Sequence, residues 1–210
     1  MIRVLLADDH GLVREGLRAI LAKGADIEVA AEAANGDEVL ALARKEEFDV
    51  ALLDLSMPGL SGIALIKRLK IERPKLRILV LSMHGEAQYA ARALKAGASG
   101  YLTKDSAASQ LLGAIRKIAA GGVQISEAAA AQLIGTAQDE SPHEKLSDRE
   151  YEVLRRIVAG GTVTDIADAL NLSVKTISTH KARILQKLNV GGTAELVRYA
   201  IEHGLADDKA

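Results

Sequence analysis

The first half of the chain alternates short apolar runs with longer stretches in which apolar residues recur every three or four positions. The apolar runs cover residues 4–7, 27–30, 50–53, 78–81 and, more weakly, 100–102. Amphipathic stretches such as residues 12–21 and 62–69 lie between them. This alternation predicts an α/β domain in which a parallel sheet of five strands is covered by helices on both faces. The last amphipathic stretch ends near residue 120, so we expect this domain to span residues 1–120.

The alternation stops at the pair Gly121-Gly122. Residues 126–135 are rich in alanine and predict one short helix, whereas residues 136–145 carry hardly any apolar side chains. A stretch with so few apolar residues is typical of an exposed linker. We therefore expect a linker with one short helix over residues 121–145.

From residue 146 onward the apolar positions have helical spacing throughout. The expected helices cover residues 147–160, 162–170, 174–189 and 193–204. Ser147 and Glu150 have the spacing of a capping box at the start of the first helix, and Ser173 is a favourable N-cap for the third. Because these helices follow one another with short connections, they predict an all-α domain of four helices over residues 146–206.

The composition excludes several kinds of site. The chain has 210 residues, a net charge of -1 that indicates no particular partner, and no cysteine, so disulfides, thiol nucleophiles and cysteine-bound metals are excluded. Aromatic residues make up 2%, which disfavours stacking on single-stranded bases. No apolar run approaches the ~18–20 residues of a membrane span, and no export signal precedes Asp8. We therefore expect a cytoplasmic protein with no membrane partner.

Charged and hydroxyl side chains follow several of the predicted strands at their carboxyl ends. These residues are Asp8 and Asp9 after the first strand, Asp54 after the third, Ser82 after the fourth and Lys104 after the fifth. Ligand sites of parallel α/β sheets lie just beyond this edge. Crowded carboxylates repel one another unless a cation lies among them, and oxygen donors favour Mg²⁺. This group of residues predicts phosphoryl transfer. Asp54 is the expected acceptor because it lies in the middle of the group and a carboxylate can act as a nucleophile.

Three sequence motifs surround these strand ends. They are VLLADDH at residues 4–10, LLDLSMPG at residues 52–59 and GYLTK at residues 100–104. Together they resemble the receiver domain of two-component response regulators, which implies a flavodoxin-like sheet with the strand order 2-1-3-4-5. The resemblance also implies that Asp9 and Asp54 bind Mg²⁺, with Asp8 beside them and the backbone carbonyl of Ser56 contributing.

The same resemblance assigns roles in signalling. It implies that a sensor histidine kinase phosphorylates Asp54 and that Lys104 pairs with the phosphoryl group. Ser82 and Tyr101 match the hydroxyl and aromatic positions of the conformational switch, in which Ser82 turns toward the phosphoryl group and Tyr101 fills the vacated space. Gly11 stands where members of the subfamily commonly carry proline, so we expect a slightly looser first loop.

The predicted helices over residues 162–170 and 174–189 have the lengths and the short connection of a helix-turn-helix motif. Residues 172–190 carry four basic and no acidic side chains. At 100° per residue the longer helix has an apolar face of Val174, Ile177, Ile184, Leu185 and Leu188. The expected DNA contacts are Lys175, Ser178, Thr179, Ala182 and Arg183 on the opposite face, together with Lys181 and Lys187. Such a basic, hydrogen-bonding face predicts binding in the major groove of double-stranded DNA.

Segments of the second domain resemble the LuxR-type DNA-binding domain. They include LSDRE at residues 146–150, LSVKTISTH at residues 172–180 and KLNV at residues 187–190. With the receiver, the chain is similar to the NarL/FixJ subfamily of response regulators, which implies a phosphorylation-controlled transcription regulator that binds promoter DNA as a homodimer. The resemblance implies contacts between DNA-binding domains through Leu196, Tyr199 and Ala200. Thr164 replaces a frequent phosphate-contacting lysine, which implies weaker contact with the DNA backbone.

Two other functions fit part of the pattern. Metal-dependent phosphatases also phosphorylate an aspartate at a strand end, but they usually carry a second aspartate two residues later, where this chain has Ser56. Turnover of small phosphate esters would separate the two. A regulator that works without phosphorylation would keep these residues for structural reasons alone, which the intact Asp9, Asp54 and Lys104 disfavour. We expect no enzyme activity beyond the protein's own aspartyl phosphorylation and dephosphorylation.

Overall fold

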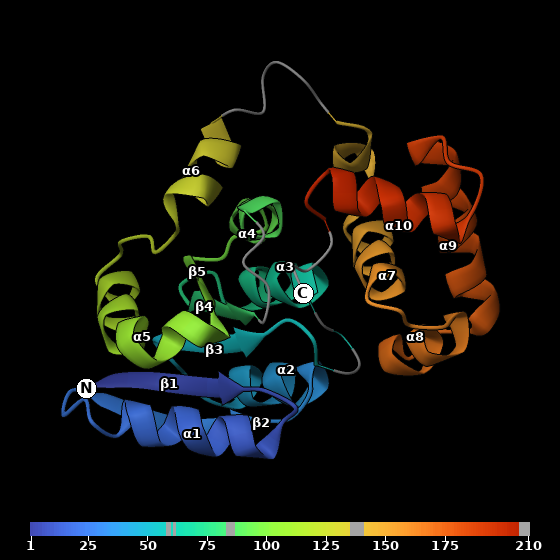
Figure 1. The fold of residues 1–210 in the computed structure, drawn as a ribbon. Helices are drawn as coiled ribbons and strands as arrows, with labels where there is room; N and C mark the ends of the chain where they lie inside the picture. Colours follow the sequence, from blue (N-terminus) through green and yellow to red (C-terminus); the bar gives the residue numbers. More distant parts are fainter. Residues whose placement is uncertain (58–59, 61, 83–86, 135–140, 206–210) are drawn as a thin grey trace. The chain divides into compact units, whose positions relative to one another are not determined.

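The computed structural model describes residues 1–57, 60, 62–82, 87–134 and 141–205 (Figure 1). The chain forms two compact units, Met1–Leu133 and Ile134–Ala210. None of the helices in the described part of the chain has the length and apolarity that a membrane crossing requires.

The described residues of the first unit contain a five-stranded sheet in which all pairs of strands are parallel. The strands are β1 (Ile2–Ala7), β2 (Ile27–Ala33), β3 (Val50–Asp54), β4 (Arg77–Ser82) and β5 (Gly100–Thr103). Their order is β2-β1-β3-β4-β5, which confirms the predicted topology. Every residue of the central strand β3 is buried. Burial on both faces explains why the strand predicted at residues 50–53 is an uninterrupted apolar run, whereas β2 is partly exposed and contains Glu28.

Helices cover both faces of the sheet. They are α1 (Gly11–Leu21), α2 (Gly36–Lys45), α3 (Gly62–Glu72), α4 (Ala87–Lys95) and α5 (Lys104–Ala119), followed by α6 (Glu127–Ile134). Figure 1 shows α1 and α5 on one face and α2, α3 and α4 on the other. The core beneath α1 and α5 combines alternate strand residues such as Leu6 and Leu52 with Leu17, Leu21 and Ile115 from the helices. The strand–helix alternation read from the sequence therefore reflects this layered packing.

The first residues after α5 add to the open edge of the sheet. The Tyr101 N–H donates to the carbonyl of Gln124 at 2.8 Å, and the Gln124 N–H donates to the carbonyl of Ser99 at 3.1 Å. Gly100 makes this approach possible, because a Cβ atom there would lie 2.8 Å from Leu79 Cδ1 and 3.0 Å from the Gln124 carbonyl. The predicted linker thus begins with a segment that is paired to β5.

The described part of the second unit is helical. Its elements are the 3₁₀ helix η1 (Pro142–Lys145), α7 (Asp148–Val158), α8 (Val163–Leu170), α9 (Val174–Leu188) and α10 (Thr193–Glu202). Ser147 and Glu150 form the predicted capping box of α7, and the Ser173 side chain accepts a hydrogen bond from the Thr176 N–H at the start of α9. Tyr151 and Ile184, which are fully buried, belong to the core. The predicted helices of this domain are confirmed.

The predicted linker differs from the structure near its end. Residues 135–140 lie outside the described residues, but Pro142–Lys145 form η1, and the His143 side chain is only 6% exposed. His143 Nδ1 lies 2.9 Å from the hydroxyl of Tyr199, whose ring stacks on His203. Histidine is polar, so the sequence pattern indicated exposure, yet this ring is covered because it has an aromatic and a hydrogen-bonding partner.

Candidate functional site

The carboxylates of Asp8 and Asp54 meet at the carboxyl end of the sheet. The neighbouring strands β1 and β3 pair with Ala7 opposite Leu53, so the next residue on each strand is an aspartate. Asp8 is 1% exposed and Asp54 is 2% exposed. Two carboxylates that are buried side by side need a cationic partner, because burial removes the water that would stabilise their charges.

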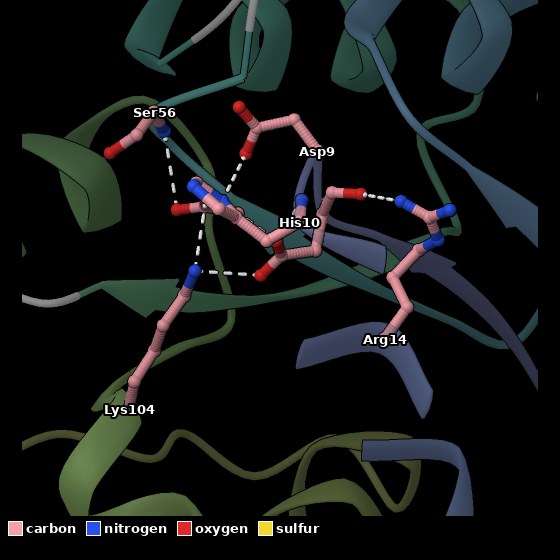
Figure 2. Close-up of polar contacts among 7 residues, drawn as sticks. Asp9, His10, Arg14, Ser56 and Lys104 are labelled. Carbon is pink, nitrogen blue, oxygen red and sulfur yellow. Dashed lines mark hydrogen bonds and ion pairs between the residues drawn. The ribbon is translucent and has the colours of Figure 1, made fainter. Parts of the chain in front are cut away.

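Lys104 supplies that cation. It is the first residue of α5, and its Nζ lies 2.6 Å from Asp8 Oδ2 and 3.0 Å from Asp54 Oδ2 (Figure 2). Burial disfavours the charge on Lys104, but Asp8 and Asp54 outweigh burial and raise the pKa of its ammonium. Burial also raises the pKa of Asp54, although Lys104 opposes this change. The structure therefore brings together three of the predicted residues in one charged contact.

Asp9 and His10 lie on the solvent side of this contact. His10 Nδ1 is 2.8 Å from Asp9 Oδ1, and the His10 N–H donates to Asp8 Oδ1 at 2.8 Å. One ligand atom from each of Asp8, Asp9, His10 and Asp54 lies within 4.8 Å of the others. Three carboxylates with one nearby lysine leave excess negative charge, so this donor set fits a hard divalent cation such as Mg²⁺. We refer to the side chains of Asp8, Asp9 and Asp54 as the acidic cluster.

The remaining predicted residues of the receiver follow Asp54 in the chain or lie on strands β4 and β5. The Ser56 N–H donates to Asp54 Oδ1 at 3.2 Å. Ser82 ends β4 directly after Leu81, the residue that pairs with Asp54, and it is 1% exposed. Tyr101 lies on the adjacent β5 and is 6% exposed. The parallel register thus places the predicted switch residues on the two strands that follow the acceptor strand in the sheet.

One contact beside the acidic cluster, with the backbone of Asp8, was not predicted from the sequence. Arg14, on α1, donates from its NH1 to the backbone carbonyl of Asp8 at 2.6 Å, and its Nε lies 3.5 Å from Glu32 Oε2. The sequence carries no signal for this bond, because it depends on how the turn between β1 and α1 folds back.

The second candidate site is the exposed face of α9. Six of its exposed residues form what we call the recognition face: Lys175, Ser178, Thr179, Ala182, Arg183 and Gln186. Ile177, Ile184 and Leu188 are buried as predicted. Val174, predicted on the apolar side, is 48% exposed because it is the first residue of the helix. Lys181 is half-buried.

The hydroxyl groups of the recognition face are bonded to their own helix. Ser178 Oγ donates to the carbonyl of Val174, and Thr179 Oγ1 donates to the carbonyl of Lys175, each at 2.9 Å. Their oxygen lone pairs remain able to accept hydrogen bonds. In this arrangement the two hydroxyls can accept from amino groups of bases, whereas Lys175 and Arg183 can only donate.

Lys187, another predicted DNA contact, is exposed, but its ammonium group is paired with groups of its own domain. Its Nζ lies 2.6 Å from Glu150 Oε2 and 3.2 Å from the carbonyl of Lys145. Although burial opposes ionisation of Glu150, bonds from Lys187 and Ser147 lower the pKa of its carboxyl. Lys187 therefore connects the end of α9 to the start of α7.

His180 has an unusual environment on the same helix. Its Nδ1 is buried and has no hydrogen-bond partner among the described residues. Burial lowers the pKa of the His180 imidazole, and the charge of Glu150 opposes this change. A buried ring nitrogen without a donor favours the neutral tautomer that carries its proton on Nε2.

The last helix differs from the expectation for dimer contacts. Leu196 and Ala200 are fully buried within their own domain, where α10 packs against α7. Tyr199 is half-buried and contacts His143. Ile201, by contrast, is 63% exposed. The helical spacing of Leu196 and Ala200 therefore marks core positions, which the sequence alone does not distinguish from an interface.

Two known protein families match the two parts of the chain that contain these sites. Residues 4–116 match the family model "Response regulator receiver domain", and residues 144–200 match "Bacterial regulatory proteins, luxR family". The chain belongs to the LuxR-type response regulators. All residues of the acidic cluster fall within the first match and α9 falls within the second, so this response regulator combines a receiver with a LuxR-type DNA-binding domain.

Relatives of the response regulator are similar over nearly the whole chain. The response regulator UvrY of Escherichia coli (strain K12) is 38% identical over 211 residues, covering 99% of this chain and 97% of UvrY. The response regulator GacA of Pseudomonas aeruginosa is 36% identical, covering 99% of each chain. The order of the two domains in this response regulator is therefore shared with full-length relatives.

Solved structures of the RcsB response regulator of Salmonella typhimurium are also similar. One, 32% identical, has a TM-score of 0.76 and covers 96% of this chain and 97% of RcsB. Another holds RcsB from Salmonella enterica serovar Typhimurium bound to promoter rprA in the presence of phosphomimetic BeF3-. It is 32% identical, has a TM-score of 0.69 and covers 95% of this chain and 98% of RcsB. These likenesses confirm the NarL/FixJ-type assignment and the role of a DNA-binding regulator in a two-component system.

Proposed function

We propose that this response regulator is switched by transfer of a phosphoryl group from a sensor histidine kinase to Asp54. The observation that carries the proposal is the contact of Lys104 Nζ with both Asp54 and Asp8. A lysine in this position can pair with the oxygens of a phosphoryl group on Asp54 without leaving its place at the end of the sheet.

The transfer forms a bond between a carboxylate oxygen of Asp54 and phosphorus while the phosphorus–nitrogen bond of a phosphohistidine breaks. Bound Mg²⁺ would neutralise charge on the transferring oxygens. Asp9 and Asp54 are its proposed ligands, with Asp8 beside them and the backbone carbonyl of Ser56 contributing.

The phosphoryl group would act on the rest of the receiver through Ser82 and Tyr101. An aspartyl phosphate adds negative charge and acceptor oxygens next to the end of β4. The Ser82 hydroxyl turns toward these oxygens, and the Tyr101 ring moves into the space that it leaves. Because the Tyr101 N–H is bonded to the carbonyl of Gln124, a shift of β5 also reaches the chain that leads to the second unit.

The proposed ligand of the recognition face is double-stranded promoter DNA, bound by a homodimer of the active form. Support comes from the exposed Lys175 and Arg183, from the short helix pair α8 and α9, and from the similarity to RcsB, which has been solved on promoter DNA. Lys181 and Lys187 are proposed as flanking contacts. Because its ligand is chromosomal DNA, we place the protein in the cytoplasm.

The test is the affinity of the full chain for duplex DNA with and without a phosphoryl analogue. The probe is the sequence that wild type with BeF3- and Mg²⁺ selects from a random duplex library. We expect BeF3- to tighten the binding of this probe by wild type and to leave the binding by Asp54→Ala unchanged. Equal responses of the two proteins would overturn the switch, and failure to select any sequence would overturn the DNA-binding role.

A further inference from the structure

Among the described residues, Arg14 links helix α1 to the backbone carbonyl of Asp8, beside the acidic cluster. Its NH1 donates to the carbonyl of Asp8 at 2.6 Å, while its Nε lies 3.5 Å from Glu32 Oε2 on β2. The Arg14 side chain is 22% exposed. Figure 2 shows Arg14 and Lys104 approaching from different sides, so the two cations do not share a ligand atom.

The carbonyl that Arg14 binds belongs to the peptide that joins Asp8 to Asp9. A peptide unit is planar, so a bond that fixes its carbonyl also fixes the position of the Asp9 Cα atom, from which the carboxylate extends. The Asp8 carboxylate has other anchors, because Lys104 and the His10 N–H both bind it. Asp9 is contacted only by His10, whose ring is 66% exposed, among the described residues.

Within the turn, the His10 N–H donates to Asp8 Oδ1, and the His10 ring lies beside the carboxylates of Asp8 and Asp9. His10 is the N-cap residue of α1 and makes no side-chain capping bond, and Gly11 follows it. Glycine allows many backbone conformations, so Gly11 itself does not stiffen the turn. The guanidinium of Arg14 adds a bond from helix α1 that fixes the carbonyl of Asp8.

We propose that Arg14 is a positioning residue for the divalent cation, because it fixes the peptide between Asp8 and Asp9 and thereby presents the Asp9 carboxylate. The proposal rests on the function proposed above. Arg14 touches neither the cation nor the phosphoryl group. Its positive charge by itself would weaken the binding of a cation, whereas its hydrogen bond would strengthen it. The sign of the effect of removing Arg14 therefore separates the two roles.

The test compares Arg14→Met with Arg18→Met in the full chain. Arg18 lies one turn further along α1 and also faces Glu32, with NH1 3.5 Å from Oε1, but within the described residues it makes no bond to Asp8. Both changes remove one positive charge near the same carboxylate. Mg²⁺ affinity is measured directly by calorimetric titration, and phosphorylation by acetyl phosphate is followed as a function of Mg²⁺ concentration.

We expect Arg14→Met to weaken Mg²⁺ binding on the order of tenfold, as is usual when a residue that orients a metal ligand is removed. The phosphorylation rate at saturating Mg²⁺ should stay at the wild-type value, because Asp54 and Lys104 are unchanged. Arg18→Met should bind Mg²⁺ as wild type does, or more tightly. Unchanged or tighter Mg²⁺ binding by Arg14→Met would overturn the proposal, as would equal losses in both variants.

A conservative variant covers the case in which Arg14→Met does not fold. Arg14→Lys keeps the charge and can reach the carbonyl with one donor. Its Mg²⁺ affinity should therefore be lower than that of wild type but higher than that expected when the bond to the carbonyl is absent. An affinity equal to that of Arg18→Lys would overturn the proposal. If wild type itself takes up no phosphate on Asp54, the proposed function fails, and the calorimetric comparison of the variants still decides the role of Arg14.

Discussion

The two charged regions of the protein hold their charges in opposite ways. In the acidic cluster, Asp8 and Asp54 are buried and are fixed by Lys104 at 2.6 and 3.0 Å. On the recognition face, Lys175 and Arg183 are exposed, and no ion pair within the described residues engages them. The acidic cluster is thus organised before any ligand arrives, whereas the charges on α9 remain solvated until DNA is bound.

This difference predicts how each region responds to amino-acid substitution and to ionic strength. Buried charges interact strongly at low effective dielectric, so one substitution in the acidic cluster should alter the chemistry completely. Exposed charges are screened by salt, so substitutions on the recognition face should have partial effects that vary with ionic strength.

The largest effect is expected from Asp54→Asn. It removes the nucleophilic carboxylate while keeping the size of the side chain, so incorporation of hydroxylamine-labile phosphate from acetyl phosphate should be lost entirely. Asp37→Asn, at an exposed position on α2, should behave as wild type. Residual labile phosphate on Asp54→Asn at the wild-type level would show that another residue is the acceptor.

A smaller effect is expected from Arg183→Ala. If arginine contacts a guanine through two hydrogen bonds, its removal costs roughly 1–3 kcal/mol of discrimination between bases. Affinities for the selected site and for single-base variants should therefore become more similar, as measured by fluorescence anisotropy. Arg198→Ala, an exposed cation on α10, is the matched control. Equal loss for every sequence would identify Arg183 as a backbone contact instead.

Lys175→Ala should weaken binding to all DNA sequences alike. Loss of one phosphate contact lowers the slope of log affinity against log salt by about 0.9. Anisotropy titrations at several salt concentrations measure this slope, and Arg198→Ala again provides the comparison. An unchanged slope would place Lys175 away from the DNA backbone.

The smallest effect concerns pH and His180, a half-buried titratable group within the DNA-binding unit. Burial lowers the pKa of His180 in the folded chain, with Arg149 and Arg183 adding to this effect and Glu150 opposing it. The unfolded state therefore binds a proton first as the pH falls through its ordinary value of about 6.5, and the stability of the folded state decreases.

This prediction can be checked by thermal unfolding at several pH values, followed through the methyl NMR signals of the buried Ile177. The difference in midpoint temperature between wild type and His180→Gln should shift in favour of the variant as the pH is lowered. A difference that stays constant with pH would contradict the assignment to His180.

The sequence predicted the fold and the acidic cluster because both depend on short-range patterns. Strands buried on both faces must be apolar, and the carboxyl ends of parallel strands must meet at one edge, so Asp8, Asp54 and Lys104 converge without further information. The capping residues of α7 and α9 were predicted for the same reason, since capping is local.

Features that depend on tertiary packing were not predicted. The bond from Arg14 to Asp8 depends on the path of a turn, and the pair of Lys187 with Glu150 depends on how α9 crosses α7. Helical spacing shows that Leu196 and Ala200 share a face but does not show what covers it. These contacts depend on how the helices and strands pack against one another, and no periodic pattern in a single sequence indicates them.

The pairing of Gln124 with β5 bears on how the receiver can be studied by itself. A chain cut after Ala120 would leave the amide of Tyr101 and the carbonyl of Ser99 without their partner at the border of the sheet. Uncovered strand borders of this kind invite self-association. A truncated receiver that retains residues through 125 should therefore stay monomeric at concentrations at which the shorter one aggregates.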